Sequence, residues 1–421
     1  MTADESSLHA RVDAEVDRGR ADAVAFLREI VRVPSDTPPG DNAPHAERTA
    51  ALLADLGFDV ERHPVPDAAV RDAGLVSITN LIVRRRFGDG PVVALNAHGD
   101  VVPPGEGWTK PPYEAVIEDG RMYGRGVAVS KSDFATYAFA LRALDAVARK
   151  QAVALRGAVE LHFTYDEEFG GELGPKWLLE RNLTRPDLAI GPGFSYAIVT
   201  AHNGCLQLEV TLHGRAAHAA MPQTGVDALF GAARVLDALY AQRARYASIL
   251  SGVAGIDSPT INVGRIDGGT NTNVVPARVV LKLDRRMIPE EDPAQVEAEL
   301  REVIQRAVES VPGLRVDIRR LLLARALVPR PGHERLAALL QAHAQRVFGE
   351  AVPVTATPLY TDARLYGEAG IPIVLYGAGP RSILEANAKR ADENLALDDL
   401  VRATKVVAAT LADLLRAPDV A

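Results

Sequence analysis

The hydrophobic positions of the chain follow two different periods before residue 205. Four stretches repeat apolar side chains at helical spacing, and three others are short apolar runs typical of buried strands. The predicted helices are 8–33, 44–56, 131–150 and 174–182, and the predicted strands are 75–86, 91–100 and 158–168. Helices that alternate with buried strands predict an α/β domain with a largely parallel sheet.

The pattern changes after residue 205. Strands with alternating apolar and polar positions are expected at 206–219, 261–269 and 277–287, and helices at 226–247 and 294–311. The α/β pattern then resumes with a helix at 331–349, a strand at 371–379 and a last helix near 397–416. We therefore expect a split α/β catalytic domain, residues 1–204 and 322–421, that carries an inserted α+β domain at 205–321.

Composition narrows the class of protein. The chain has 421 residues, of which 47% are hydrophobic and 24% are charged, and this suits a globular protein of two domains. A formal net charge of −8 argues against a nucleic-acid partner. One cysteine, Cys205, excludes a disulfide within the chain and suits a reducing compartment. With no apolar leader and no run of 18 apolar residues, we expect a cytoplasmic protein without a membrane partner.

Candidate chemistry lies just beyond two predicted strands. In the sequence HGD, His98 could bind a metal through one ring nitrogen while Asp100 orients the other. In DEE, Glu167 and Glu168 could divide the work of general base and metal ligand. Each motif alone is weak evidence for an active site. A structural histidine bonded to a loop, or a pair of solvated acids, would give the same sequence pattern.

The ordered series of motifs is much more specific than either one. The stretches VPSDTPPGD, NAHGDVVP, TYDEEFGG, GRAAHAAMP, NTNVVP and TDARLYGEAGIP follow one another in an order that resembles the dinuclear-zinc amidohydrolase family. That family includes aminoacylases, acetylornithine and succinyl-diaminopimelate deacylases and glutamate carboxypeptidases. The resemblance covers about residues 24–415. It implies a zinc-exopeptidase-like catalytic domain, a lid domain that commonly dimerises, and an amide substrate with a free carboxylate.

The resemblance also implies five metal ligands, and this chain departs from that set. His98 and Glu168 match two of them, whereas the other three positions fall on Val129, Gly193 and Lys389. Asp133 could stand in for the ligand missing at Val129, but one helical turn displaces it by about 5–6 Å, and a metal–oxygen bond is about 2 Å long. We therefore expect no dinuclear metal site and no cofactor, with zinc or another divalent metal only if unusual ligands serve.

Charge suggests how the altered site would hold together. The ammonium group of Lys389 offers three donors, and we expect it to form an ion pair with Glu167 or Glu168 in a cluster that includes His98 and Asp100. Asp133 is expected in the first turn of a helix, where a carboxylate favours the helix dipole.

The substrate contacts implied by the resemblance are retained. His218 matches a lid histidine that reaches across the dimer, and Asn273 and Arg286 match residues that bind the carbonyl and carboxylate of the substrate. Arginine suits the carboxylate because its guanidinium group forms two parallel hydrogen bonds. We interpret Arg364, as a partner of Asp362, and also His202, His213 and Cys205 as structural residues.

Three functions stay open from the sequence. The first is hydrolysis of a small carboxylate-bearing amide or amino-acid derivative, with Glu167 activating water and with His218 and Lys389 stabilising the oxyanion. The second is a metal-free isomerase or lyase in which Glu167 and Lys389 transfer protons. The third is a ligand-binding or scaffold protein without catalysis. In each case we expect a homodimer formed through residues 205–321.

Overall fold

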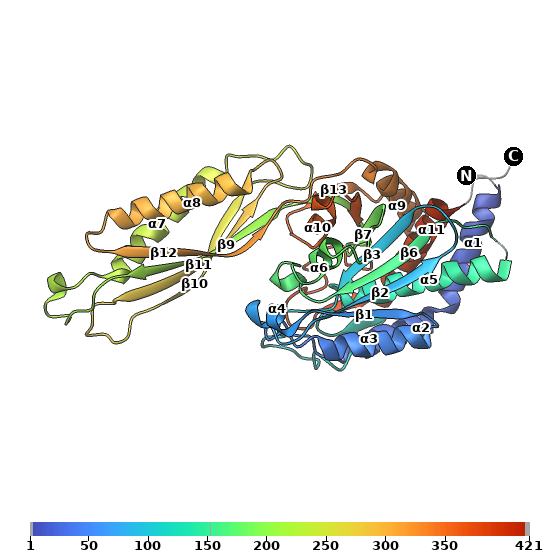
Figure 1. Cartoon of the computed structure of the whole chain (residues 1–421), viewed down its shortest axis with the longest axis horizontal. Coiled ribbons are helices and arrows are strands. Elements are labelled where there is room, and N and C mark those ends of the chain that lie inside the picture. Colours follow the sequence, from blue (N-terminus) through green and yellow to red (C-terminus); the bar gives the residue numbers. More distant parts are fainter. Residues whose placement is uncertain (1–2, 152, 417–421) are drawn as a thin grey trace. The chain divides into compact units, whose positions relative to one another are not determined.

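The computed structural model describes residues 3–151 and 153–416, which form two compact units (Figure 1). The first unit contains the described residues up to Thr200, Pro329–Thr355 and those from Leu365 onward. The second unit contains Ala201–Val328 and Ala356–Arg364. The second unit is longer than the insertion expected at 205–321. It also includes Ala356–Arg364, which the sequence analysis assigned to the catalytic domain.

The first unit is built around an eight-stranded sheet with the order β1-β2-β6-β3-β7-β14-β8-β13. Its strands are β1 (Val60–Pro64), β2 (Thr79–Arg86), β3 (Val92–His98), β6 (Ala158–Thr164), β7 (Leu188–Gly191), β8 (Ile198–His202), β13 (Val354–Thr357) and β14 (Ile373–Leu375). The last two residues of β8 and of β13 belong to the second unit, which therefore contains His202. The central strands β6, β3, β7 and β14 run parallel, while β1, β2 and β8 pair antiparallel with their neighbours. The α/β class is thus confirmed, and the sheet is mixed with a parallel centre.

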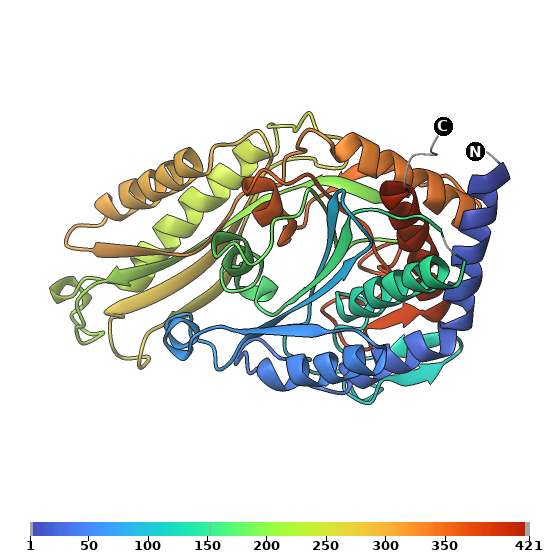
Figure 2. The same ribbon diagram turned by 45° about the vertical axis from the view of Figure 1, so that its right-hand side comes forward.

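Helices complete the first unit around this sheet (Figure 2). They are α1 (Ala3–Arg18), α2 (Arg20–Val31), α3 (Ala43–Asp55), α4 (Asp67–Asp72), α5 (Lys131–Gln151), α6 (Pro175–Glu180), α9 (His333–Phe348), α10 (Ala363–Glu368) and α11 (Leu397–Leu415). The long helix α5 packs on β3 and β6, and α1, α2 and α11 pack on α5. A separate small sheet joins β4 (Val116–Glu118), β5 (Arg121–Tyr123) and β15 (Asn394–Ala396).

The predicted helix at 8–33 is wrong in one respect, because the structure has two helices that meet at Gly19. The amide of Gly19 bonds back to α1, and its carbonyl group accepts the first hydrogen bond of α2 from Ala23. Glycine is the weakest helix former after proline, so the chain bends most easily there. A Cβ atom at Gly19 would lie 3.3 Å from the ring of Phe139 on α5, so the small residue also allows close packing.

Two predicted strands end earlier than the hydrophobic pattern suggests. The strand expected at 158–168 stops at Thr164, and the acidic residues continue into the short 3-10 helix η1 (Glu167–Phe169). The carboxylate of Asp166 accepts a hydrogen bond from the backbone of Leu173 at 2.5 Å, which turns the chain away from the sheet. Similarly, the strand expected at 206–219 ends at residue 213, which leaves His218 in a loop.

The second unit is an antiparallel sheet covered on one face by two helices. Its strands, in the order β10-β11-β9-β12, are β9 (Gly204–His213), β10 (Thr260–Gly268), β11 (Arg278–Met287) and β12 (Arg315–Ala324). Helices α7 (Ala228–Tyr246) and α8 (Pro293–Glu309) begin at Asp227 and Asp292, whose carboxylates accept hydrogen bonds from backbone amides of the first turn. Buried leucine and valine side chains of both helices and of β9 and β11 form the core of the unit.

No helix within residues 3–151 and 153–416 combines the length and the apolar character needed to cross a membrane. The cytoplasmic location stays a prediction.

Candidate active site

Parallel pairing brings the two acidic motifs to one edge of the first unit. Strand β3 ends at His98, which lies opposite Thr164, the last residue of β6. Because the carboxyl ends of parallel strands meet at one edge of a sheet, Asp100 and the acids of η1 become neighbours. His98, Asp100 and Glu167 are buried, whereas Glu168 is partly exposed.

Asp100 fixes both the histidine and the acidic turn. The Nδ1 atom of His98 donates a hydrogen bond to the carbonyl oxygen of Asp100 at 3.0 Å and lies 3.4 Å from its Oδ1 atom. The Oδ2 atom of Asp100 accepts a hydrogen bond from the backbone amide of Glu168 at 2.9 Å. The other ring nitrogen of His98, Nε2, lies 3.9 Å from Oε2 of Glu167.

Lys389 joins this cluster through the ion pair that the sequence predicts. Its Nζ atom donates to Oε2 of Glu168 at 2.7 Å, and the two residues are 221 positions apart. The Lys389 side chain is 55% exposed and that of Glu168 is 10% exposed, so the pair lies at the open side of the cluster. The ion pair with Glu168 is confirmed.

The crowding of acids in this cluster perturbs its protonation. Burial lowers the pKa of His98, but the carboxylates of Glu167 and Asp100 outweigh it and raise that pKa to about 10. Burial raises the pKa of Glu167, and the neighbouring His98 opposes that effect only in part. A carboxylate with a raised pKa is a better proton acceptor than an ordinary one near neutral pH, which suits a general base.

A buried ion pair that sequence analysis missed connects two loop segments near the cluster. Nη1 of Arg125 lies 2.6 Å from Oε2 of Glu393, and both side chains are almost fully buried. The second oxygen of Glu393 accepts a hydrogen bond from the amide of Ala128 at 3.1 Å. Because Ala128 precedes Val129 and Glu393 follows the loop of Lys389, this pair joins the two segments that carry Val129 and Lys389.

Gly193 and Asp133 are joined by a hydrogen bond between the Gly193 backbone and the Asp133 carboxylate. A Cβ atom at Gly193 would lie 2.7 Å from the amide nitrogen of Tyr376, so the end of β14 leaves no room for a side chain. Asp133 lies in the first turn of α5, as predicted. Its carboxylate accepts a hydrogen bond from Ala378 at 2.8 Å and another from the amide of Gly193, rather than serving as a free ligand. Burial raises the pKa of Asp133 to about 8.

The predicted substrate-binding residues lie in the second unit and do not form one group there. His218 and Asn273 are neighbours, since the amide of Ala219 donates to the carbonyl of Asn273 at 3.0 Å. Both are exposed. Arg286 lies near the far end of β11, so a distance of about 26 Å separates it from the start of that strand, at about 3.3 Å per residue. Its Nε atom donates to Asp284 at 2.7 Å.

The residues interpreted as structural have structural partners. The Nδ1 atom of His202 donates to the carbonyl oxygen of Asn203 at 2.8 Å, and Nε2 accepts a hydrogen bond from the amide of Thr361 at 3.3 Å. Burial lowers the pKa of His202 to about 4. Cys205 is buried, and its thiol donates to Asp284 at 3.3 Å. His213 lies 2.9 Å from Asp317 at the surface.

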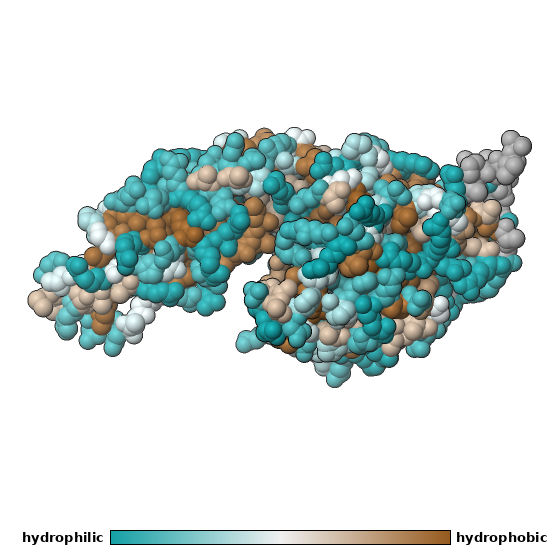
Figure 3. Space-filling model, viewed as in Figure 1, coloured by the Kyte–Doolittle hydropathy of each residue, from teal (hydrophilic) through white to brown (hydrophobic). Residues whose placement is uncertain are grey.

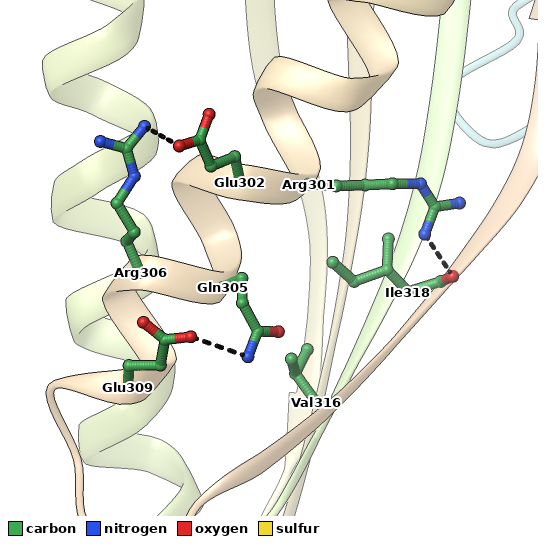
Figure 4. Close-up of a pocket in the computed structure, with 7 residues that line it drawn as sticks. All are labelled: Arg301, Glu302, Gln305, Arg306, Glu309, Val316 and Ile318. Carbon is green, nitrogen blue, oxygen red and sulfur yellow. Dashed lines mark hydrogen bonds and ion pairs between the residues drawn. The ribbon is translucent and has the colours of Figure 1, made fainter.

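An open pocket of about 580 Å³ on the second unit contains none of the predicted site residues (Figure 4). Its lining residues are Arg301, Glu302, Gln305, Arg306, Glu309, Val316 and Ile318. Charged side chains there have partners within the protein, since Glu302 pairs with Arg306 at 3.1 Å and Arg301 donates to the backbone carbonyl of Ile318 at 2.9 Å. Figure 3 shows hydrophobic surface between α8 and β12, where partly buried side chains such as Val316 and Ile318 pack on the core.

Comparison with known proteins agrees with this geometry. The chain is 31% identical over 396 residues to the succinyl-diaminopimelate desuccinylase of Methylobacterium sp. (strain 4-46), which covers 90% of this chain and 92% of that protein. It is 30% identical over 396 residues to the acetylornithine deacetylase of Myxococcus xanthus, with 92% and 96% covered.

Two solved structures share the fold at lower identity. The M20 family metallo-carboxypeptidase Sso-CP2 from Sulfolobus solfataricus matches with a TM-score of 0.76 and 19% identity over 92% of this chain and 98% of that one. The Bacillus subtilis protein YXEP, described as a dinuclear metal binding peptidase from the M20 family, matches with a TM-score of 0.64 and 16% identity over 95% and 99%.

These matches correct one expectation from the sequence. These two members of the M20 family are described as a metallo-carboxypeptidase and as a dinuclear metal binding peptidase, so the expectation of no cofactor is wrong. The degenerate metal site stays a prediction. At the three positions concerned, the side chains of Val129 and Gly193 have no ligand atom, and Lys389 is paired with Glu168.

The model of a single family covers most of the chain. Residues 94–413 match Peptidase family M20/M25/M40, a span that includes the whole cluster around His98 and the second unit. This protein therefore belongs to Peptidase family M20/M25/M40 and is a hydrolase of the deacylase and peptidase type.

Proposed function

We propose that this protein hydrolyses the amide bond of a small N-acyl amino acid that carries a free carboxylate. The observation that carries the proposal is the buried Glu167, held beside His98 at the edge of the sheet with a raised pKa. Relatives named acetylornithine deacetylase and succinyl-diaminopimelate desuccinylase act on compounds of this class, as their names state.

In this proposal Glu167 takes a proton from the attacking water and delivers it to the leaving amine. Asp100 orients His98 and the acidic turn through the contacts described above. Lys389 places a positive charge at the exposed side of the cluster, where it stabilises the developing oxyanion or holds a carboxylate of the substrate. Its ion pair with Glu168 favours this electrostatic role over proton transfer, so it gives no support to an isomerase or lyase.

The test is hydrolysis of a panel of N-acetyl and N-succinyl amino acids, assayed with and without added zinc. Glu167→Gln should lower turnover by roughly 10²–10⁴-fold, the usual share of general acid–base catalysis. Glu172→Gln is the matched control, since Glu172 is an exposed carboxylate of the same loop region paired with Lys176. Absence of hydrolysis across the panel under both conditions would overturn the proposed function.

We also propose that the active protein is a homodimer whose sites combine two chains. Within the second unit, the group formed by His218 and Asn273 is separated from Arg286 by most of the length of β11. All three can contact one small substrate only if the His218 group comes from a second copy of the chain. Strand β10 is an open edge of its sheet, and α7 exposes Leu229 and Tyr240, features that suit pairing between two copies.

Mixing two inactive variants tests this arrangement. Chains with Glu167→Gln are mixed with chains with His218→Ala after reversible dissociation. Sites that combine two chains would recover about one quarter of normal activity, because half of randomly paired dimers are mixed and each mixed dimer has one intact site. No recovery from a mixture shown to contain mixed dimers would mean that each site uses a single chain.

A further inference from the structure

Three helices of the first unit bring together two histidines and one aspartate away from the cluster at His98. His9 comes from α1, His343 from α9 and Asp413 from α11, and these helices lie together near the labelled chain ends in Figure 1. The Nε2 atom of His9 lies 2.7 Å from Oδ1 of Asp413, and that of His343 lies 2.7 Å from Oδ2. We propose that these three residues form a metal site separate from the cluster at His98, which binds a divalent transition ion such as zinc.

The geometry fits an ion held between the three side chains. Among the residues that the structure describes, this is the one group of at least three potential ligands whose ligand atoms all lie within 4.8 Å of one another. The two imidazole rings stand nearly perpendicular, with an angle of 80° and centroids 4.6 Å apart, so their Nε2 atoms converge from different directions. An ion about 2.1 Å from both the nitrogen and the oxygen of a 2.7 Å pair would have a nitrogen–ion–oxygen angle of about 80°. That angle is smaller than a tetrahedral one, and it would widen if the side chains moved slightly apart.

Chemistry and burial determine which ion would bind. Two imidazoles and one carboxylate suit zinc and related transition ions, whereas magnesium and calcium prefer oxygen ligands. His9 and His343 are 3% and 4% exposed, while the Asp413 side chain is 21% exposed. The exposed side of Asp413 gives an ion a route in and leaves a coordination position for water.

The surrounding charges do not oppose a cation. Asp13 of α1 pairs with Arg346 of α9 at 2.6 Å, and Asp17 of α1 pairs with Lys405 of α11 at 2.7 Å. An ion at this site would connect the first helix of the chain to two helices near its other end, and it would stabilise the folded state because the unfolded chain lacks the site.

Zinc binding to the full chain, first stripped of metal by a chelator, tests the proposal. His98→Gln serves as the parent, so that the cluster in the active site contributes as little zinc as possible. Adding His343→Gln or Asp413→Asn should remove about one equivalent of bound zinc and abolish any zinc-dependent rise in Tm. His213→Gln in the same parent is the matched control and should remove none, because His213 belongs to an exposed histidine–aspartate pair.

Equal zinc binding by the parent and the two variants would overturn the proposal and leave a hydrogen-bonded group only. If either variant does not fold, a zinc-soaked crystal of the unaltered chain decides. An anomalous peak about 2.0–2.2 Å from both Nε2 atoms would support the site. Absence of such a peak at saturating zinc would refute it.

Discussion

Replacing Glu393 with glutamine measures how far the active-site loops depend on one buried ion pair. Arg125 and Glu393 have side chains that are 1% and 2% exposed, with 2.6 Å between Nη1 and Oε2. The variant keeps the shape of the side chain and one acceptor for the amide of Ala128, but it removes the negative charge. The guanidinium group of Arg125 would then remain buried with no charged partner.

The expected loss is large because the arginine cannot return to water. Breaking a buried ion pair by removing one partner costs about 3–5 kcal/mol. For a unit of this size, each kcal/mol corresponds to about 2 °C in Tm, so the first unit should unfold about 6–10 °C lower. The two units need not unfold together, and the signal must therefore report the first one. Both tryptophans of the chain, Trp108 and Trp177, belong to that unit, so their fluorescence provides the assay.

A matched control separates burial from pairing. Arg20 and Asp398 also lie 2.6 Å apart, but their side chains are 53% and 63% exposed. Asp398→Asn should therefore change the free energy of unfolding by no more than about 1 kcal/mol. If Glu393→Gln shifts the transition no further than Asp398→Asn, the argument from burial is wrong. Adding Arg125→Met to Glu393→Gln should recover part of the loss, because it removes the unpaired charge.

Three smaller predictions concern other positions. Burial lowers the pKa of His202 to about 4, below the ordinary value of about 6.5, so the folded state excludes a proton that the unfolded chain accepts. The free energy of unfolding of the second unit should fall as pH drops from about 6.5 to about 4, and His202→Gln should flatten that fall in melts followed by circular dichroism. Gly193→Ala should lower the Tm of the first unit, because its Cβ atom would lie 2.7 Å from the amide of Tyr376; an unchanged Tm would show that the backbone yields. Burial raises the pKa of Glu160, but bonds to His162 and Thr184 lower it to about 2, so its stabilisation is complete above about pH 4.5 and is lost as pH falls towards 2. Glu160→Gln should therefore reduce the acid sensitivity of tryptophan fluorescence melts.

The hydrophobic pattern predicted the elements that depend on local spacing. Helix α5 and strand β3 agree with the expected 131–150 and 91–100 to within a few residues, because a period of 3.6 or a buried apolar run is visible within one segment. The change of pattern at 205 reflects the change from a sheet buried on both faces to one covered on a single face.

Features that depend on distant partners could not be predicted in this way. Arg125 and Glu393 are 268 positions apart, and each looks like an ordinary charged residue of a loop. His9, His343 and Asp413 likewise occupy helix positions that a pattern assigns to a polar or mixed face. The end of β6 was missed for a related reason, since the turn depends on a hydrogen bond that the amide of Leu173 donates to Asp166, and no periodicity reveals this bond.

The three positions that the sequence predicts to have lost metal ligands lie in different parts of the fold, and this affects how metal dependence should be tested. An acid at Gly193 would clash with the backbone of Tyr376, so that substitution alone would disturb β14 before it could act as a ligand. Histidine at Lys389 would leave Glu168 without its 2.7 Å partner in a cluster already crowded with acids. Effects of substitutions that share contacts are not additive, so restoring one ligand at a time would mix changes in packing, charge and coordination. Metal content and activity of the unaltered chain, measured across a zinc titration, involve none of these disturbances and are therefore the direct measure of what a metal contributes.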